Sequence, residues 1–403
     1  MATDTLLTDS GDLRQWQAAL SAGDPHALGF MRGRGWFTSG LGAFTPVRSP
    51  LDGPSGPHRP SDDPRAYASL ATYYRPDPDA PDGLPYISID ARYSPYLYDY
   101  DTYDFDRAAG HIFWLGRRAF LAGDDRALGL MADWVDAWFV DGQTSLRPHL
   151  LHAQFIPGVR DGWAVGTIDF SVRLPGVIDM VRANASRLPG RVVDGFAAWA
   201  DALLDWLIDG PYTAWLAAAQ RNNIGTYYDL LVACLAIHVD RPDVARGRLL
   251  RLGPDRIKAQ IGPGGNMDEE LRRRISLTYS TMNLIGMLEN VSLARRVGID
   301  LRADDPDAWG RLRAGVESLL PALTGGAPWE HPQVKPMPEW FEAPLIRHAD
   351  RLLGFESLGD RWLDHVGIPG FPGVMAAVLT PHVQPPPPPD RTDHALGERE
   401  TGP

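Results

Sequence analysis

Two adjacent asparagines stand inside an otherwise apolar, helix-like stretch of the chain. They belong to the segment RNNIGTYYD at residues 221–229. Buried amides need hydrogen-bond partners. Asn222 and Asn223 therefore either cap the start of a helix, which is a common role of asparagine, or face a binding site. The following Gly225 and Thr226 favour the cap for one of the two.

A second candidate feature is a cluster of tyrosines. The stretch ARYSPYLYDYDTYDF contains the tyrosines Tyr93, Tyr96, Tyr98, Tyr100 and Tyr103. Tyrosine suits both wet and dry surfaces, because its ring is apolar and its tip is polar. The cluster is either a platform on which sugar rings stack or an aromatic seal between the preceding loops and the body of the protein.

The elements that would position these residues are helical. From Asp104 to Phe355, apolar residues recur at i, i+3, i+4 and i+7, as in DRALGLMADWVDAWFVDG, and several such stretches end near glycine. No comparable run alternates apolar and polar residues as a strand would. The pattern predicts an all-α protein built from paired antiparallel helices, either a solenoid or a closed ring of hairpins.

The two ends of the chain have a different composition. Residues 1–91 are rich in Pro, Gly, Asp and Ser, which predicts a long ordered loop or lid with one helix near residues 11–22. Residues 92–380 form the predicted helical body. Residues 384–403 begin with a run of prolines and predict a disordered, extended tail.

Composition excludes several classes of function. The net charge of −12 argues against a nucleic-acid partner, which would need a clustered basic face. The single cysteine, Cys234, cannot form an intramolecular disulfide and is expected in the core. We find no signal peptide, no membrane-spanning run and no metal or cofactor motif, so we expect a cytoplasmic protein without a cofactor.

Four segments, in order, resemble the alginate lyase family of polysaccharide lyases. The stretch NNIGTYYDLLVACLA is similar to that family's NNHGTWYDVQVAALA pattern, and QIGPGGNMDEELRRRISLTYS is similar to QIDPDGSQPLELARTRSLSYS. The resemblance spans roughly residues 86–348. It implies an incomplete (α/α) toroid with a deep cleft. It also implies cleavage of uronate polymers by β-elimination, in which a carboxylate is neutralised while a base removes the α proton.

The resemblance assigns three roles. Asn223 takes the position of a carboxylate-binding asparagine, Tyr279 that of the acid/base tyrosine, and Arg273 that of an arginine six residues before it. We expect Arg273 on a bend or just before the helix that carries Tyr279, where its charge would lower the pKa of that tyrosine. The run of arginines at 272–274 lets this alignment slip by one residue.

The chain departs from the family pattern at two positions. Ile224 stands where the family has a histidine, and an isoleucine cannot donate, accept or titrate. His152 stands where the family usually has a tyrosine, and His149 lies nearby. Either His152 compensates for the lost histidine, or it is only part of a polar loop. Without compensation, Tyr279 transfers both protons alone, as a syn elimination allows, or the chemistry has changed.

Weaker candidates for the cleft wall are Asn222, Gln154, Tyr228 and His331. Each main candidate also has a purely structural interpretation. Arg273 could form an ion pair with Glu269 or Glu270 at helical spacing, and Tyr279 could be a core tyrosine with a satisfied hydroxyl. Taken together and in family order, the residues favour a cleft site.

Three functions fit these observations. We favour a repurposed bacterial enzyme that performs Tyr279-mediated proton abstraction or β-elimination on a small carboxylated metabolite of a biosynthetic pathway. The alternative is a lyase acting on a uronate poly- or oligosaccharide such as alginate or glucuronan. The second alternative is a non-catalytic glycan-binding protein. The expected partner is therefore a carboxylated small molecule or oligosaccharide, with no nucleic acid and no membrane.

Overall fold

A computed structural model describes residues 4–32, 40–213, 215–216, 220–338 and 340–375 of the 403-residue chain. Most of this part is α-helical. The helices are α1 Ser10–Ser21, α2 Pro25–Arg32, α4 Thr102–Ala122, α5 Asp125–Val135, α6 Thr167–Ser171, α7 Leu174–Asn184, α8 Gly190–Asp209, α9 Asn223–His238, α10 Pro242–Leu249, α11 Lys258–Gln260, α12 Asp268–Leu271, α13 Ser276–Arg296, α14 Leu301–Asp304, α15 Pro306–Leu323, α16 Ala343–Leu353 and α17 Leu358–Val366. The predicted tail at 384–403 lies outside the described residues.

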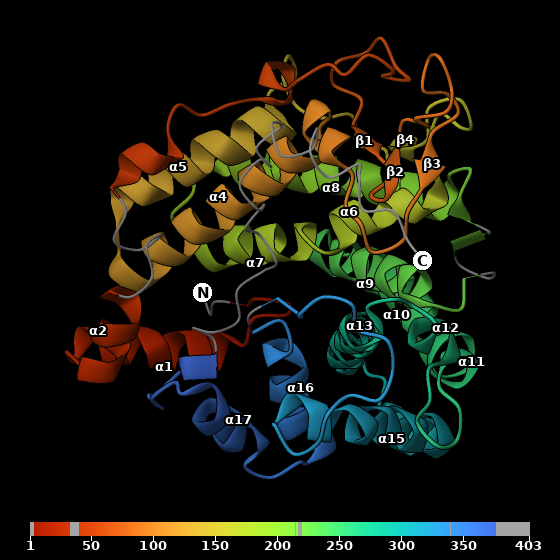
Figure 1. Cartoon of the computed structure of the whole chain (residues 1–403). Coiled ribbons are helices and arrows are strands. Elements are labelled where there is room, and N and C mark those ends of the chain that lie inside the picture. The colour runs from red at the N-terminus through yellow and green to blue at the C-terminus, as the bar shows by residue number, and fades with distance from the viewer. Residues whose placement is uncertain (1–3, 33–39, 214, 217–219, 339, 376–403) are drawn as a thin grey trace.

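The helices form a ring of antiparallel hairpins (Figure 1). Contacts run from α4 to α7, from α7 to α9, from α9 to α13 and from α13 to α16, which makes these the inner helices. α5, α10 and α17 each pack against the inner helix next to them in the chain, while α8 packs on α9 and α15 on α13. This arrangement confirms the prediction of an incomplete (α/α) toroid.

The inner position of α9 follows from its composition. All of its residues from Asn223 to Ala236 are buried, and its apolar residues lie on every face rather than on one stripe. A helix of this kind is stable only when other elements surround it. α9 therefore occupies the middle of the ring, where it contacts α6, α7, α8, α10 and α13.

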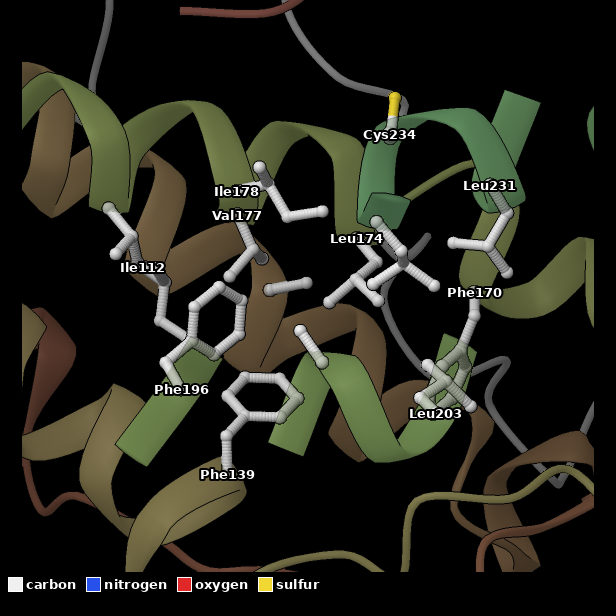
Figure 2. Packing of buried hydrophobic residues seen from close by; sticks show 14 of the residues in the cluster. Ile112, Phe139, Phe170, Leu174, Val177, Ile178, Phe196, Leu203, Leu231 and Cys234 are labelled. Atoms are coloured by element: carbon white, nitrogen blue, oxygen red, sulfur yellow. The ribbon is translucent and has the colours of Figure 1, made fainter. Parts of the chain in front are cut away.

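The largest core lies between the helices from α4 to α10. Figure 2 shows part of it, where Ile112, Phe139 and Phe196 pack near Val177 and Ile178 of α7. Cys234 is fully buried in this cluster. Its expected core position is confirmed, and burial raises the pKa of its thiol, which keeps it protonated.

The predicted N-terminal helix exists as α1 and connects the two ends of the ring. Trp16 of α1 packs in a second core together with Trp362 of α17. On the same helix, Asp12 accepts two hydrogen bonds, of 2.7 and 2.9 Å, from the guanidinium of Arg347 in α16. Because α1 also contacts α4, it joins the first and last inner helices (Figure 1).

The segment before α1 is attached to the inner ring. The buried carboxylate of Asp179 in α7 accepts backbone hydrogen bonds from Leu6, Leu7 and Thr8. Asp4 pairs with Arg182 of α7 and with Arg296 at the end of α13, both at 2.7 Å. The first described residues therefore tie α7 to α13.

Within the described residues, four short strands organise the loop-rich region, and the sequence did not predict them. β1 (Ala68–Leu70) pairs in parallel with β4 (His152–Phe155), and β2 (Tyr74–Arg75) pairs antiparallel with β3 (Ile87–Ser88). Strands this short lack the length that makes an alternating pattern visible. They fix the path of residues 68–90 next to the helical ring. None of the described helices is long and apolar enough to span a membrane.

We expect Arg347→Met to lower the free energy of unfolding by about 3 kcal/mol, because it removes a buried cation from two carboxylates. The Arg347 side chain is only 5% exposed, and it lies 2.7 Å from Asp12 and 3.5 Å from Asp9. Urea denaturation measures the change. Arg191→Met is the control, since Arg191 pairs with Asp136 at the surface with 66% of its side chain exposed. Equal losses in both variants would contradict a role for Arg347 in closing the ring.

Candidate active site

Two tyrosines from distant parts of the chain meet at the start of α13. Tyr279 lies in the first turn of α13, and Tyr73 lies in the loop between β1 and β2. Their hydroxyl oxygens are 2.7 Å apart, which is a strong hydrogen bond between two phenols. Tyr73 was not among the residues that the sequence analysis singled out.

Arg273 lies against the ring of Tyr279. It sits between α12 and α13, as expected, and its guanidinium carbon is 3.8 Å from the centre of the Tyr279 ring. Its Nη2 donates to the carboxylate of Asp90 at 2.9 Å. Asp90 follows β3, so the N-terminal region supplies both partners of the Arg273–Tyr279 pair, namely Asp90 and Tyr73.

The geometry resolves which arginine of the run at 272–274 belongs to the site. Arg272 is exposed and pairs with Glu269. Arg274 donates to the backbone carbonyl of Asp90 at 3.1 Å. Arg273 alone among these three contacts the ring of Tyr279. The helical pairing considered for Arg273 is therefore made by Arg272 instead.

The expected direction of the Tyr279 pKa was wrong. Burial raises the pKa of Tyr279 above its ordinary value, and this effect outweighs the opposing influence of Arg273 and of the hydrogen bond from Tyr73. Burial and the adjacent Tyr279 also raise the pKa of Tyr73. A proton lost from this pair therefore comes from Tyr279, which has the guanidinium on its ring.

Asn223 binds a buried carboxylate of the protein itself. Its backbone N–H donates to Oε1 of Glu270 at 2.9 Å, and its side-chain Nδ2 lies 3.0 and 3.1 Å from the two oxygens of that group. Burial raises the pKa of Glu270, while Asn223 and Arg273 act in the opposite direction. In this conformation the amide of Asn223 positions Glu270. Its action on a substrate carboxylate remains a prediction of the resemblance.

The neighbouring amide has the structural role that its type suggested. Asn222 is the N-cap of α9, and its side-chain oxygen accepts a hydrogen bond from the backbone of Ile224 at 3.1 Å. Tyr228 is buried and donates to the carbonyl of Leu207 at 3.0 Å. These contacts give both residues structural partners away from Tyr279.

Gln154 belongs to a separate buried network. Its side chain donates to Asp169 at 2.8 Å, and its backbone N–H donates to the hydroxyl of Ser69. Ser69 and Tyr67 also donate to Asp169, at 2.6 and 3.1 Å. Burial raises the pKa of Asp169 to about 6 despite these three donors. The segment GTIDF, which contains Asp169, lies in the region of family resemblance and could have drawn attention to it.

The contacts of the histidines that the structure describes lie away from the Tyr73–Tyr279 pair. His152 Nδ1 lies 3.1 Å from the carbonyl of Asp161, and its ring lies 6.3 Å from that of His149. Neither contact leads to Tyr279. His331 is exposed, with its ring 5.1 Å from that of Trp329. Ile224 packs in the main core with 9% exposure.

The tyrosine cluster divides between sealing and exposed roles. Tyr98 and Tyr103 stack with ring centres 3.7 Å apart, and Tyr100 is buried against Phe155. Tyr93 and Tyr96, in contrast, are 55% and 41% exposed. Tyr93 also lies 5.7 Å from the ring of Tyr73, so it borders the site.

Comparison with known proteins identifies the family to which the chain belongs. A model of the alginate lyase family matches residues 54–329, and the chain therefore belongs to the alginate lyase family. An alginate lyase from Bacteroides ovatus is 25% identical, with a TM-score of 0.82 over 94% of this chain and 100% of that chain. Alginate lyase A1-III from Sphingomonas species A1 is 14% identical, with a TM-score of 0.48 over 96% and 98% of the two chains. No curated protein sequence matches the chain.

The site combines the parts that proton transfer needs. Tyr279 is a phenol whose loss of a proton is favoured by a guanidinium and by a second hydroxyl. Arg273 is a permanent cation, held by Asp90, that can also bind a carboxylate. The two phenols are close enough to exchange a proton directly.

We expect Tyr73→Phe to raise the pKa of Tyr279 still further, because the change removes a hydroxyl that stabilises the phenolate. The ring contact between positions 73 and 93 would be retained. Carbon NMR of labelled tyrosine measures the titration, with the Tyr279 signal assigned by its absence in Tyr279→Phe. An unchanged or lower pKa would show that the 2.7 Å contact does not stabilise the phenolate.

Proposed function

We propose that this protein is a lyase that cleaves uronate poly- or oligosaccharides by β-elimination, with Tyr279 as the acid/base residue. The observation that carries the proposal is the arrangement of Tyr279 between the Tyr73 hydroxyl and the Arg273 guanidinium. Membership of the alginate lyase family supports the same reaction class. The similarity to the Bacteroides ovatus alginate lyase over nearly the whole chain supports a glycan as the substrate.

The reaction follows from the chemistry of these groups. Arg273 binds the carboxylate of one uronate residue and lowers the energy of the charge that develops when the adjacent carbon loses its proton. Tyr279, as the phenolate, takes that proton. A carbon–carbon double bond forms while the bond to the glycosidic oxygen breaks. The leaving oxygen receives the proton from the hydroxyl of Tyr279 or Tyr73, which restores the starting state of the pair.

Ile224 limits the geometry of this elimination. It offers no base on its side of the substrate, so both proton transfers are assigned to the two phenols. Because their oxygens are 2.7 Å apart, both transfers occur on one face of the sugar. The proposal is therefore a syn elimination, and it needs no contribution from His152.

From the sequence we favoured a small biosynthetic metabolite as the substrate. That hypothesis rested on Ile224 and on the absence of a recognisable signal peptide. The family match and the structural similarity give it no support, and they agree with the glycan substrate instead. A non-catalytic glycan-binding role would place no demand on the Tyr73–Tyr279–Arg273 contacts. Their presence favours catalysis.

Replacement of Tyr279 tests its role as the acid/base residue. On incubation with alginate, glucuronan and their short oligomers, we expect the ultraviolet absorbance of an unsaturated uronate to rise, and Tyr279→Phe to lower the rate about 10³-fold. Tyr212→Phe is a control, since its hydroxyl donates to the Leu151 carbonyl away from this pair. Circular dichroism would show that each variant is folded. No absorbance change with any uronate would overturn the proposal.

The stereochemistry of the substrate tests the proposed syn elimination. A syn elimination requires the departing proton and the leaving oxygen on the same face of the ring, as in mannuronate and glucuronate linkages. We expect oligomers with these linkages to be cleaved faster than guluronate oligomers, in which the two groups lie on opposite faces. Initial rates on defined oligomers measure the difference. A preference for guluronate would require a base on the other face, which Ile224 cannot supply.

A further inference from the structure

A lysine lies beside the proposed elimination site without a role in it. The Lys335 ammonium is 4.0 Å from the centre of the Tyr93 ring, and this ring lies 5.7 Å from that of Tyr73. Tyr73 in turn contacts Tyr279. Lys335 is therefore connected to the acid/base pair through two aromatic rings.

The position of Lys335 is fixed by the strand-like contacts that precede it. The backbone N–H of Val334 donates to the backbone carbonyl of Arg274 at 2.9 Å, and that of Ser276 donates to the backbone carbonyl of Pro332 at 2.9 Å. The side-chain oxygen of Gln333 accepts from Leu277 at 3.0 Å. The latter bond satisfies one of the free N–H groups in the first turn of α13.

Gln333 also connects this anchor to the lysine itself. Its Nε2 donates to the Thr278 hydroxyl at 2.8 Å and to the backbone carbonyl of Lys335 at 2.9 Å. Thr278 is the residue before Tyr279. The backbone of Lys335 is therefore held in a fixed position relative to the start of α13.

The charge of Lys335 is available for a ligand. Burial lowers the pKa of Lys335, while Asp90 acts in the opposite direction. Among the described residues, no carboxylate lies within ion-pair distance of its ammonium, whereas Lys258 pairs with Asp305 at 2.7 Å. The aromatic face stabilises the cation without neutralising it. Tyr93 is 55% exposed and Lys335 is half-buried, so this pair borders solvent next to the proposed site.

We propose that Lys335 and Tyr93 form a second carboxylate subsite, which binds the uronate next to the one that loses its proton. The inference rests on the proposed function, because the neighbouring sugar exists only if the substrate is a uronate chain. Lys335 would bind the carboxylate of that sugar, and Tyr93 would support its ring. Lys335 acts here as a specificity-determining residue, since it touches a sugar whose bonds to hydrogen do not change.

The test compares two substrates and three variants. The substrates are a uronate oligomer and the same oligomer in which the carboxylate of only the neighbouring sugar is reduced to an alcohol. We expect Lys335→Met to raise KM for the first substrate about tenfold with little change in kcat, because the contact is made equally in the ground and transition states. Lys335→Arg should restore part of the affinity, since it keeps the cation.

Lys258→Met is the matched control, because it removes the only other lysine of the chain at a position paired with Asp305. It should leave KM unchanged. For the wild type, KM should rise on the reduced substrate by the same factor by which Lys335→Met raises KM on the charged substrate. For Lys335→Met, KM on the reduced substrate should show no additional rise.

The outcomes separate the two proposals. If the wild type cleaves the charged oligomer but Lys335→Met has the wild-type KM, the subsite is wrong and the lyase proposal stands. If the wild type cleaves no uronate, the lyase proposal fails. Calorimetric binding of the oligomer to Tyr279→Phe then shows whether Lys335 still contributes to affinity. A lower affinity of the Tyr279→Phe/Lys335→Met double variant than of Tyr279→Phe would support the carboxylate subsite, and equal affinity would contradict it.

Discussion

The geometry of the candidate site depends on one buried carboxylate. The carboxylate of Glu270 in α12 accepts hydrogen bonds from the backbone N–H and the side-chain amide of Asn223, the first residue of α9. A buried carboxylate is costly unless donors satisfy it, so these bonds strongly favour one relative position of the two elements. The carbonyl of Glu270 also accepts from the backbone of Arg273. The interaction therefore sets the path of the chain from α9, the most buried inner helix, to the residues that lead into Tyr279.

The ring of helices supplies only half of the site. Tyr279 and Arg273 come from the ring, whereas Tyr73 and Asp90 come from the N-terminal region. The pairing of β1 with β4 and of β2 with β3 sets where Tyr73 and Asp90 lie. Because α1 also closes the ring through Asp12 and Arg347, the first part of the chain both completes the fold and completes the site.

The sequence predicted the helical ring well, because the apolar periodicity of its helices is long and repeated. Resemblance to a family identified Tyr279 and Arg273, which lie close together in the chain. It could not identify Tyr73 or Asp90, whose contacts with Tyr279 and Arg273 span 206 and 183 residues of sequence. These pairings depend on loops and short strands, whose paths leave no periodic signal.

One residue-level expectation failed for a related reason. The pKa of Tyr279 was expected to fall because an arginine is close, but burial has the larger effect, and burial cannot be read from the spacing of two residues. Asn223 was expected to bind a substrate carboxylate; in the structure its amide donates to Glu270, and its action on a substrate stays a prediction. A residue type defines what a side chain can bind, and the fold decides which partner reaches it.

The distribution of charge places a constraint on any anionic substrate. The chain carries a net charge of −12, so long-range attraction of a polyanion is unfavourable. The cations that gather near Tyr279, namely Arg273, Arg274 and Lys335, must act at short range, where the carboxylate of Asp90 opposes them. Short-range contacts with partly buried cations are screened less by salt than surface attraction is. Under the proposed function, recognition of a uronate chain would depend on matching the spacing of its carboxylates to Arg273 and Lys335, and this requirement would select for a defined linkage rather than for charge in general.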